Sequence, residues 1–232
     1  MDGKNLKGAI FDFNGTLIDD SEFHDRAWNE ISMQLRGRPF TEDEIRINIY
    51  GKNNRAIVEY LSAGVPDADS TGTLAVKKEN IYRGLCLANP ERFRLVPGAR
   101  DFLDRLKSMD IPMAIATASG LDNVEFYIKH LGLERWFSTG RIVYDNSSFQ
   151  GKPAPDFYLE ASKRLGLSPR ECVVFEDSQA GLKSAQNAGI GMIVALVPGK
   201  SSYLKNHHLR IDMTIGDFTE ITAGQFFTSF DS

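Results

Sequence analysis

Short apolar runs alternate with amphipathic segments over most of this chain. The runs have the length of buried strands, and turn residues bound them. The predicted strands are 8–11, 112–116, 141–144, 172–175 and 192–196, with 213–215 as an edge strand. Apolar residues at helical spacing lie between them, and the predicted helices are 102–109, 121–131, 155–165 and 178–188. Strands that alternate with helices indicate βαβ units and a parallel sheet.

The stretch 20–93 shows only helical spacing. Four helices are expected there, and two of them open with the capping-box spacing, at Asp19 with Glu22 and at Thr41 with Glu44. A similar spacing at 168–171 is followed at once by a strand, so a turn is expected there. The predicted fold is α/β: a Rossmann-like parallel sheet core (1–19 and 94–232) with an inserted all-α, four-helix cap domain (20–93). An insertion after the first strand is expected to lie over the carboxyl ends of the strands.

Composition narrows the class of protein. The 232 residues are 42% hydrophobic, with a net charge of -4, which argues against a general nucleic-acid surface. No apolar run approaches the ~18 residues of a membrane span. No signal peptide is visible at the start, and Cys86 and Cys172 are expected as buried thiols. We therefore expect a cytoplasmic protein that binds neither membrane nor nucleic acid, with a monomer as the default.

Polar residues follow three of the predicted strands. They are Asp12 with Asn14, Thr117 with Ser119, and Glu176 with Asp177. The ligand crevice of an open α/β sheet lies at the carboxyl ends of its strands. Asp12 and Asp177 together suit Mg²⁺, and an aspartate can attack phosphorus to form an aspartyl phosphate. Lys152, held between a glycine and prolines, is expected to place an ammonium against a phosphoryl group.

These residues carry a resemblance to a known family. The chain resembles the haloacid dehalogenase superfamily, in its β-phosphoglucomutase-like branch with a helical cap. The resembling segments are Asp12–Leu17, Thr117 after 114–116, Lys152–Pro155, Glu176–Gly181 and the cap entry 19–28. The resemblance spans nearly the whole chain, with the motifs in order at predicted strand ends.

The resemblance implies a set of roles around Asp12, which would attack phosphorus in line. Mg²⁺ would be held by the Asp12 carboxylate, the Asn14 backbone carbonyl and Asp177, with Glu176 nearby or acting through water. Lys152 would neutralise charge. Thr117 would hold phosphoryl oxygens together with the amides that follow it, those of Ala118 and Ser119. The substrate contacts implied in the cap are His24, Gly51, Lys52 and Lys78.

Several of these residues also have plain structural interpretations. Ser119 satisfies backbone groups in a turn at least as readily as it binds substrate. Glu176 either binds metal or orients its neighbours. His24 is either a catalytic or a packed histidine. Lysines on helices and loops face solvent by default, and only the resemblance favours a role for Lys78 and Lys52.

Asn14 departs from the family pattern, because most phosphatases and mutases of this kind have an aspartate there. That aspartate protonates the leaving oxygen and later activates water, and a carboxamide does neither. Three accounts stay open. The position was changed to trap a complex; or the enzyme uses a good leaving group or an acid from the cap, Glu22 or His24; or the protein binds without turnover.

The cap holds a second departure. Asn54 falls where β-phosphoglucomutases carry an arginine for the second phosphate of a sugar bisphosphate, which weakens the mutase interpretation. The sequence therefore predicts a Mg²⁺-dependent phosphatase of a small phosphorylated metabolite, such as a sugar phosphate. A β-phosphoglucomutase-type sugar phosphomutase and a catalytically impaired phospho-ligand binder are the alternatives.

Overall fold

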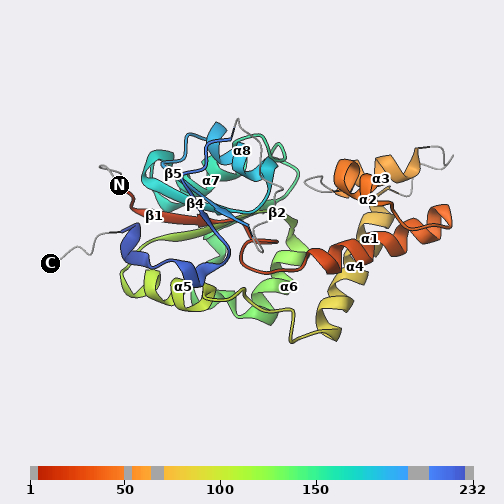
Figure 1. Ribbon diagram of the computed structural model, residues 1–232, viewed down its shortest axis with the longest axis horizontal. Helices are drawn as coiled ribbons and strands as arrows, with labels where there is room; N and C mark the ends of the chain where they lie inside the picture. The colour runs from red at the N-terminus through yellow and green to blue at the C-terminus, as the bar shows by residue number, and fades with distance from the viewer. Residues whose placement is uncertain (1–4, 50–53, 64–70, 198–208, 228–232) are drawn as a thin grey trace. The chain divides into compact units, whose positions relative to one another are not determined.

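The computed structural model describes residues 5–49, 54–63, 71–197 and 209–227. The chain divides into two compact units, one formed by residues 1–18 with 95–232 and the other by residues 19–94 (Figure 1). We call them the core unit and the helical unit. Gly51 and Lys52, two of the expected substrate contacts, lie outside the described residues.

The core unit is built on a sheet in which every strand pair is parallel. Its strands are β1 (Gly8–Phe11), β2 (Met113–Gly120), β3 (Ile142–Asp145), β4 (Cys172–Glu176), β5 (Met192–Leu196) and β6 (Met213–Ile215). Their order is β3-β2-β1-β4-β5-β6. The order reverses between β1 and β4, and such a switch point opens a crevice at the carboxyl ends. The predicted parallel, Rossmann-like sheet is confirmed.

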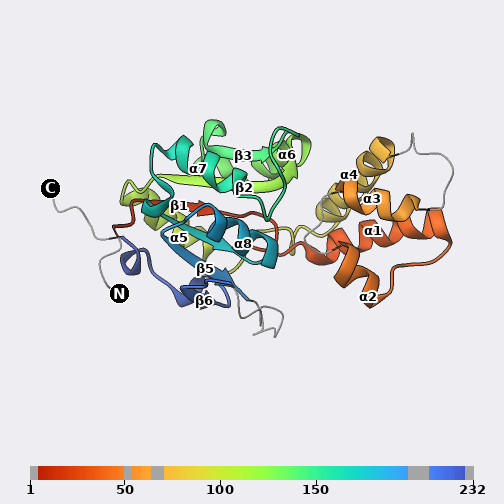
Figure 2. The same cartoon turned by 90° about the horizontal axis from the view of Figure 1, so that it is seen from above.

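Helices cover both faces of this sheet (Figures 1 and 2). They are α5 (Ala99–Ser108), α6 (Leu121–Leu131), α7 (Asp156–Leu165) and α8 (Gln179–Asn187). On one face α7 and α8 pack against Ile10 and Val174. On the other, the Phe11 ring stacks on Phe175 with centroids 4.9 Å apart and meets Phe102 of α5 edge-on. The central strands β1, β4 and β5 are thus buried on both sides, which explains their continuous apolar runs in the sequence.

Two local predictions in the core unit need correction. The strand expected to end at Ala116 continues to Gly120, with a shift of register against β3 between these two residues. The turn expected at 168–171 is a short 3₁₀ helix, Pro169–Glu171, and both bonds of its capping box form. A single helical turn fits between Ser168 and the start of β4. The capping-box spacing therefore indicated a real helix, even though a strand follows at once.

The described part of the helical unit contains helices and no strands. They are α1 (Ser21–Arg36), α2 (Glu42–Glu44), the π-helix η1 (Ile45–Ile49), α3 (Asn54–Ser62) and α4 (Thr71–Ala88). The capping box of Thr41 with Glu44 is confirmed. The one expected at Asp19 is wrong, because α1 begins after Asp20, whose carboxylate accepts a hydrogen bond from Tyr82. A tertiary partner has replaced the local cap.

The structure also describes both cysteines and the lengths of the helices. Cys86 and Cys172 are free and buried, as predicted. Across the ranges the structure describes, no helix is both long and apolar enough to cross a membrane.

Candidate active site

Asp12 stands at the carboxyl end of the central strand. β1 is buried along its length, and the amide of Asp12 continues the pairing with β4 by donating to the carbonyl of Phe175 at 3.0 Å. This pairing brings Asp12 beside Glu176, the last residue of β4. Only 6% of Asp12 is exposed. The central strand therefore presents a nearly buried carboxylate at the switch point of the sheet.

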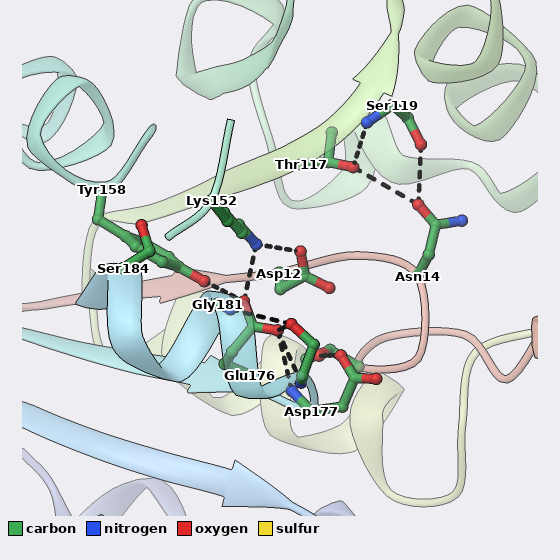
Figure 3. Close-up of polar contacts among 12 residues, drawn as sticks. Asp12, Asn14, Thr117, Ser119, Lys152, Tyr158, Glu176, Asp177, Gly181 and Ser184 are labelled. Atoms are coloured by element: carbon green, nitrogen blue, oxygen red, sulfur yellow. Dashed lines mark hydrogen bonds and ion pairs between the residues drawn. The ribbon is translucent and has the colours of Figure 1, made fainter. Parts of the chain in front are cut away.

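Lys152 joins the carboxylates from the two neighbouring strands (Figure 3). Its Nζ lies 2.6 Å from Oδ1 of Asp12 and 2.7 Å from Oε2 of Glu176. The same Glu176 oxygen accepts a hydrogen bond from the hydroxyl of Tyr158 on α7, and the ring of Tyr158 lies 5.0 Å from Nζ. Two carboxylates and one aromatic ring thus hold the ammonium of Lys152 in place.

The second oxygen of Glu176 ties β4 to the start of α8. Oε1 accepts from the amides of Asp177 and Ser178, at 3.2 and 3.0 Å, and from the Ser178 hydroxyl at 2.9 Å. A Cβ on Gly181 would lie 1.9 Å from Oε2, so only glycine fits beside this carboxylate. With both oxygens held by donors, Glu176 is placed to orient Lys152 and the Asp177 loop.

Asp177 faces the loop that follows β1. Its Oδ1 accepts from the hydroxyl of Thr16 at 3.2 Å. Gly15 has φ of 81°, and a Cβ there would lie 2.2 Å from Oδ2 of Asp177. Both the left-handed conformation and this close approach require glycine. The carboxylate of Asp177 therefore explains why the segment Asp12–Leu17 has a glycine at position 15.

The pKa values show a surplus of negative charge. Burial and the charge of Glu176 raise the pKa of Asp12 to about 7, despite Lys152. Burial, Glu176 and Asp12 raise the pKa of Asp177 well above its usual range. Burial opposes the charged forms of Glu176 and Lys152 as well. Their mutual attraction outweighs it, lowering the pKa of Glu176 and raising that of Lys152. One ammonium does not neutralise these carboxylates.

An acidic cluster of this kind can hold a metal ion. Asp12, Glu176 and Asp177 each offer one oxygen, and these oxygens lie within 4.8 Å of one another. Carboxylate oxygens are the ligands of hard divalent cations, and a cation would relieve the repulsion that raises the pKa values of Asp12 and Asp177. The donor set and its charge therefore fit such a cation.

The hydroxyls of the β2 end lie against Asn14 (Figure 3). Oδ1 of Asn14 accepts from Ser119 Oγ at 2.8 Å and from Thr117 Oγ1 at 3.5 Å. Its Nδ2 donates to the hydroxyl of Tyr127 on α6 at 2.9 Å. Thr117 also accepts from the amide of Ser119, and Ala118 between them is exposed. The irregular end of β2 thus fixes the Asn14 carboxamide.

Sequence reasoning missed Tyr158, Tyr127 and Thr16. Both tyrosines occupy inward positions of amphipathic helices and are almost fully buried. Their rings match the apolar pattern, which hides the hydroxyls. A buried tyrosine hydroxyl usually has a polar partner, so a tyrosine at an inward helix position could have indicated a contact with the polar strand ends. Thr16 lies in the resembling segment Asp12–Leu17, but no role was assigned to it.

His24 and Lys78 lie together within the helical unit. Lys78 Nζ is 2.7 Å from Nδ1 of His24 and 2.8 Å from a carboxylate oxygen of Glu79. The His24 ring stacks on Tyr82 with centroids 4.0 Å apart. Lys78 is only 1% exposed, so the default of a solvated lysine is wrong here. Trp28 and Tyr82 are buried in this unit.

Comparison with known proteins places the chain in a family. The model of the haloacid dehalogenase-like hydrolases matches residues 6–189. The phosphorylated carbohydrates phosphatase of Thermotoga maritima is 30% identical over 83% of this chain and 86% of its own. Hexitol phosphatase A of Escherichia coli is 30% identical over 94% of each chain. The beta-phosphoglucomutase of Bacillus subtilis is 29% identical over 80% of this chain and 81% of its own.

Solved structures agree with these relatives. The crystal structure of a HAD hydrolase, family IA, variant 3, from Entamoeba histolytica superimposes with a TM-score of 0.84. It is 34% identical, and the match covers 95% of this chain and 97% of that one. The resemblance seen in the motifs is therefore confirmed, and the chain belongs to the haloacid dehalogenase-like hydrolases.

Proposed function

We propose that this protein is a Mg²⁺-dependent phosphatase of a small phosphorylated metabolite, with Asp12 as the phosphoryl acceptor. The observation that carries the proposal is the buried cluster in which Lys152 bridges Asp12 and Glu176 at the switch point of the sheet. The relatives named as phosphatases of phosphorylated carbohydrates and hexitols support a phosphohydrolase and favour a sugar phosphate as substrate class.

Each core residue has a part in this proposal. Asp12 attacks phosphorus, while Lys152 neutralises charge on the carboxylate and the phosphoryl group, 2.6 Å from the attacking side chain. Thr117 and the amides of Ala118 and Ser119 bind phosphoryl oxygens. When bound, Mg²⁺ supplies positive charge against the phosphoryl oxygens.

The cation would be held by Asp12, Asp177 and the backbone carbonyl of Asn14. Glu176 spends both carboxylate oxygens on donors from the protein. It would therefore act as an orienting residue near the cation. His24 and Lys78 stay predictions as substrate contacts, as do Gly51 and Lys52.

The test compares phosphate release from a panel of phosphorylated carbohydrates with and without Mg²⁺. Asp12→Asn preserves shape and removes the nucleophile, so release should fall to background. Asp101→Asn makes the same change at an exposed position of α5 and should leave release unaltered. Equal turnover in the native protein and Asp12→Asn would refute the mechanism.

Two other functions are each favoured by one observation. A catalytically silent phospho-ligand binder is favoured by Asn14, and it predicts Mg²⁺-dependent binding without turnover on the whole panel. A sugar phosphomutase is favoured by the B. subtilis relative. It predicts net isomerisation that requires a bisphosphate activator and releases little free phosphate.

A further inference from the structure

The groups that surround Asn14 are unsuited to moving protons at neutral pH. Its carboxamide oxygen accepts from the hydroxyls of Ser119 and Thr117, and its nitrogen donates to the hydroxyl of Tyr127. A carboxamide neither gains nor loses a proton near neutral pH, and aliphatic hydroxyls and phenols are poor acids and bases there. This side of the site therefore orients and binds, without acid–base capacity.

The carboxylates of Asp12, Glu176 and Asp177 are occupied by other contacts or assigned to other roles. Glu176 holds Lys152 through one oxygen and the start of α8 through the other. Asp177 accepts from Thr16 and lies within the acidic cluster that suits a divalent cation. Asp12 itself is the nucleophile of the proposed function. No carboxylate among these is placed to serve as a general acid or base.

The described groups around Asn14 in the core unit supply no acid, and in that case the first half-reaction depends on the leaving group. Oδ of Asp12 forms a bond to phosphorus while the bond from phosphorus to the leaving oxygen breaks, and the electron pair stays on that oxygen. A carboxylate leaves readily as an anion because its conjugate acid has a pKa of about 4. A sugar alkoxide is a far stronger base and requires a proton. Acyl phosphates are therefore the donors that this site handles without help.

Energetics favour the same class of donor. An aspartyl phosphate is itself a mixed anhydride of a carboxylic and a phosphoric acid. Transfer from an acyl phosphate to Asp12 exchanges one such anhydride for another and is nearly balanced in free energy. Transfer from a sugar ester to Asp12 runs uphill. The free energy of phosphoryl transfer therefore favours the acyl donor.

The second half-reaction receives no comparable help. The water oxygen bonds to phosphorus, the bond from phosphorus to Asp12 breaks, and one water proton has to pass to bulk solvent. Absence of a general base typically costs about 10²–10⁴-fold in rate. We propose, resting on the function above, that acyl phosphates phosphorylate Asp12 rapidly and that the aspartyl phosphate then persists. The protein would thus act as a slow phosphatase with a long-lived phosphorylated state.

The experiment mixes the full chain and Mg²⁺ with acetyl phosphate or with a sugar phosphate, and follows intact mass and phosphate release together. With acetyl phosphate, native protein should gain one phosphoryl group before steady release begins. Asn14→Asp supplies a carboxyl group at the same place, so the adduct should no longer accumulate. Release should then rise about 10²–10⁴-fold, with sugar phosphates gaining most.

Two further variants are controls for site and for charge. Asp12→Asn should gain no phosphoryl group. Asn146→Asp makes the same change of charge as Asn14→Asp at an exposed turn, where the side-chain oxygen accepts from Ser148 in either form. Its adduct and its release rate should match those of the native protein.

The outcomes separate this inference from the proposed function. Fast release from both donors, without an adduct and unchanged in Asn14→Asp, would overturn the inference, because a base would then come from elsewhere. The proposed function would survive that result if release still required Asp12. Release that ignores Asp12→Asn, or no adduct and no release with either donor, would overturn both.

Discussion

Each unit of this protein buries a lysine among carboxylates and aromatic rings, and the two lysines differ in what surrounds them. Lys152 in the core unit makes ion pairs with two buried carboxylates, of Asp12 and Glu176. Lys78 in the helical unit pairs with Glu79, and its Nζ lies 5.3 Å from the rings of both Trp28 and Tyr82.

Their pKa values move in opposite directions. Burial is the largest influence on both and favours the neutral amine. The carboxylates of Asp12 and Glu176 outweigh burial and raise the pKa of Lys152, whereas burial prevails over Glu79 and lowers the pKa of Lys78. In the core unit the carboxylates outnumber the lysine, and this surplus of negative charge is what suits a divalent cation.

Replacement of each lysine by methionine should show the difference between the two lysines most strongly. Lys152→Met removes charge that neutralises the transition state and should lower kcat by about 10²–10³-fold. Lys78→Met removes a predicted substrate contact, so its effect should appear in KM. Steady-state phosphate release measures both constants. Equal losses of kcat in the two variants would contradict the distinction.

Added Mg²⁺ should stabilise the core unit through its surplus of carboxylates. A ligand at about 100 times its Kd adds about 2.7 kcal/mol to the free energy of unfolding. Thermal denaturation should show this gain in the native protein and in Glu79→Gln of the helical unit. Asp177→Asn should lose it, and a persistent Mg²⁺ shift in that variant would place the cation elsewhere.

The pH dependence of the metal-free protein should come from the core carboxylates. Folding raises the pKa of Asp12 from 3.8 to about 7, so the folded state binds the proton more tightly than the unfolded state. The resulting stabilisation is complete below the unfolded value and is lost as the pH rises through the folded one. Melting temperature should therefore fall from about pH 4 to about pH 7.

Two variants make this pH test specific. Asp12→Asn should flatten the fall in melting temperature because it removes the titrating carboxyl group. Lys78→Met in the helical unit should keep it. Saturating Mg²⁺ should also suppress the fall, since the cation competes with the proton. A melting temperature that rises over this range would contradict a raised pKa of Asp12 in the folded protein.

Removal of one hydroxyl from each unit should have the smallest effect. Tyr158→Phe keeps its ring beside Lys152 and loses the hydrogen bond to Glu176. Without this donor Glu176 holds Lys152 and the Asp177 loop less firmly, so Mg²⁺ binding should weaken by at most about tenfold, the full value of one bond to a charged group (about 1.5 kcal/mol). Tyr82→Phe loses the matching bond to Asp20. Calorimetry should show unchanged Mg²⁺ affinity there; equal losses would make the effect non-specific.

The sequence predicted the parts of this protein that depend on local pattern. Apolar runs such as 172–175 gave the buried strands, and the polar residues after them gave Asp12, Glu176 and Asp177 at one edge of the sheet. The interactions that needed the folded chain were missed. The hydroxyl of Tyr158 reaches Glu176 from a helix whose pattern shows only an apolar face. Asp20 replaces Asp19 at the start of α1 because Tyr82, far along the chain, binds its carboxylate.

Borohydride reduction of the phosphorylated protein tests the central claim most directly, because it converts an aspartyl phosphate to homoserine at the modified position. The protein is treated with Mg²⁺ and acetyl phosphate, reduced, digested and sequenced by mass spectrometry. The account predicts homoserine at Asp12 in native protein and none at that position in Lys152→Met on the same timescale. Homoserine at another aspartate, with Asp12 intact during turnover, would contradict it.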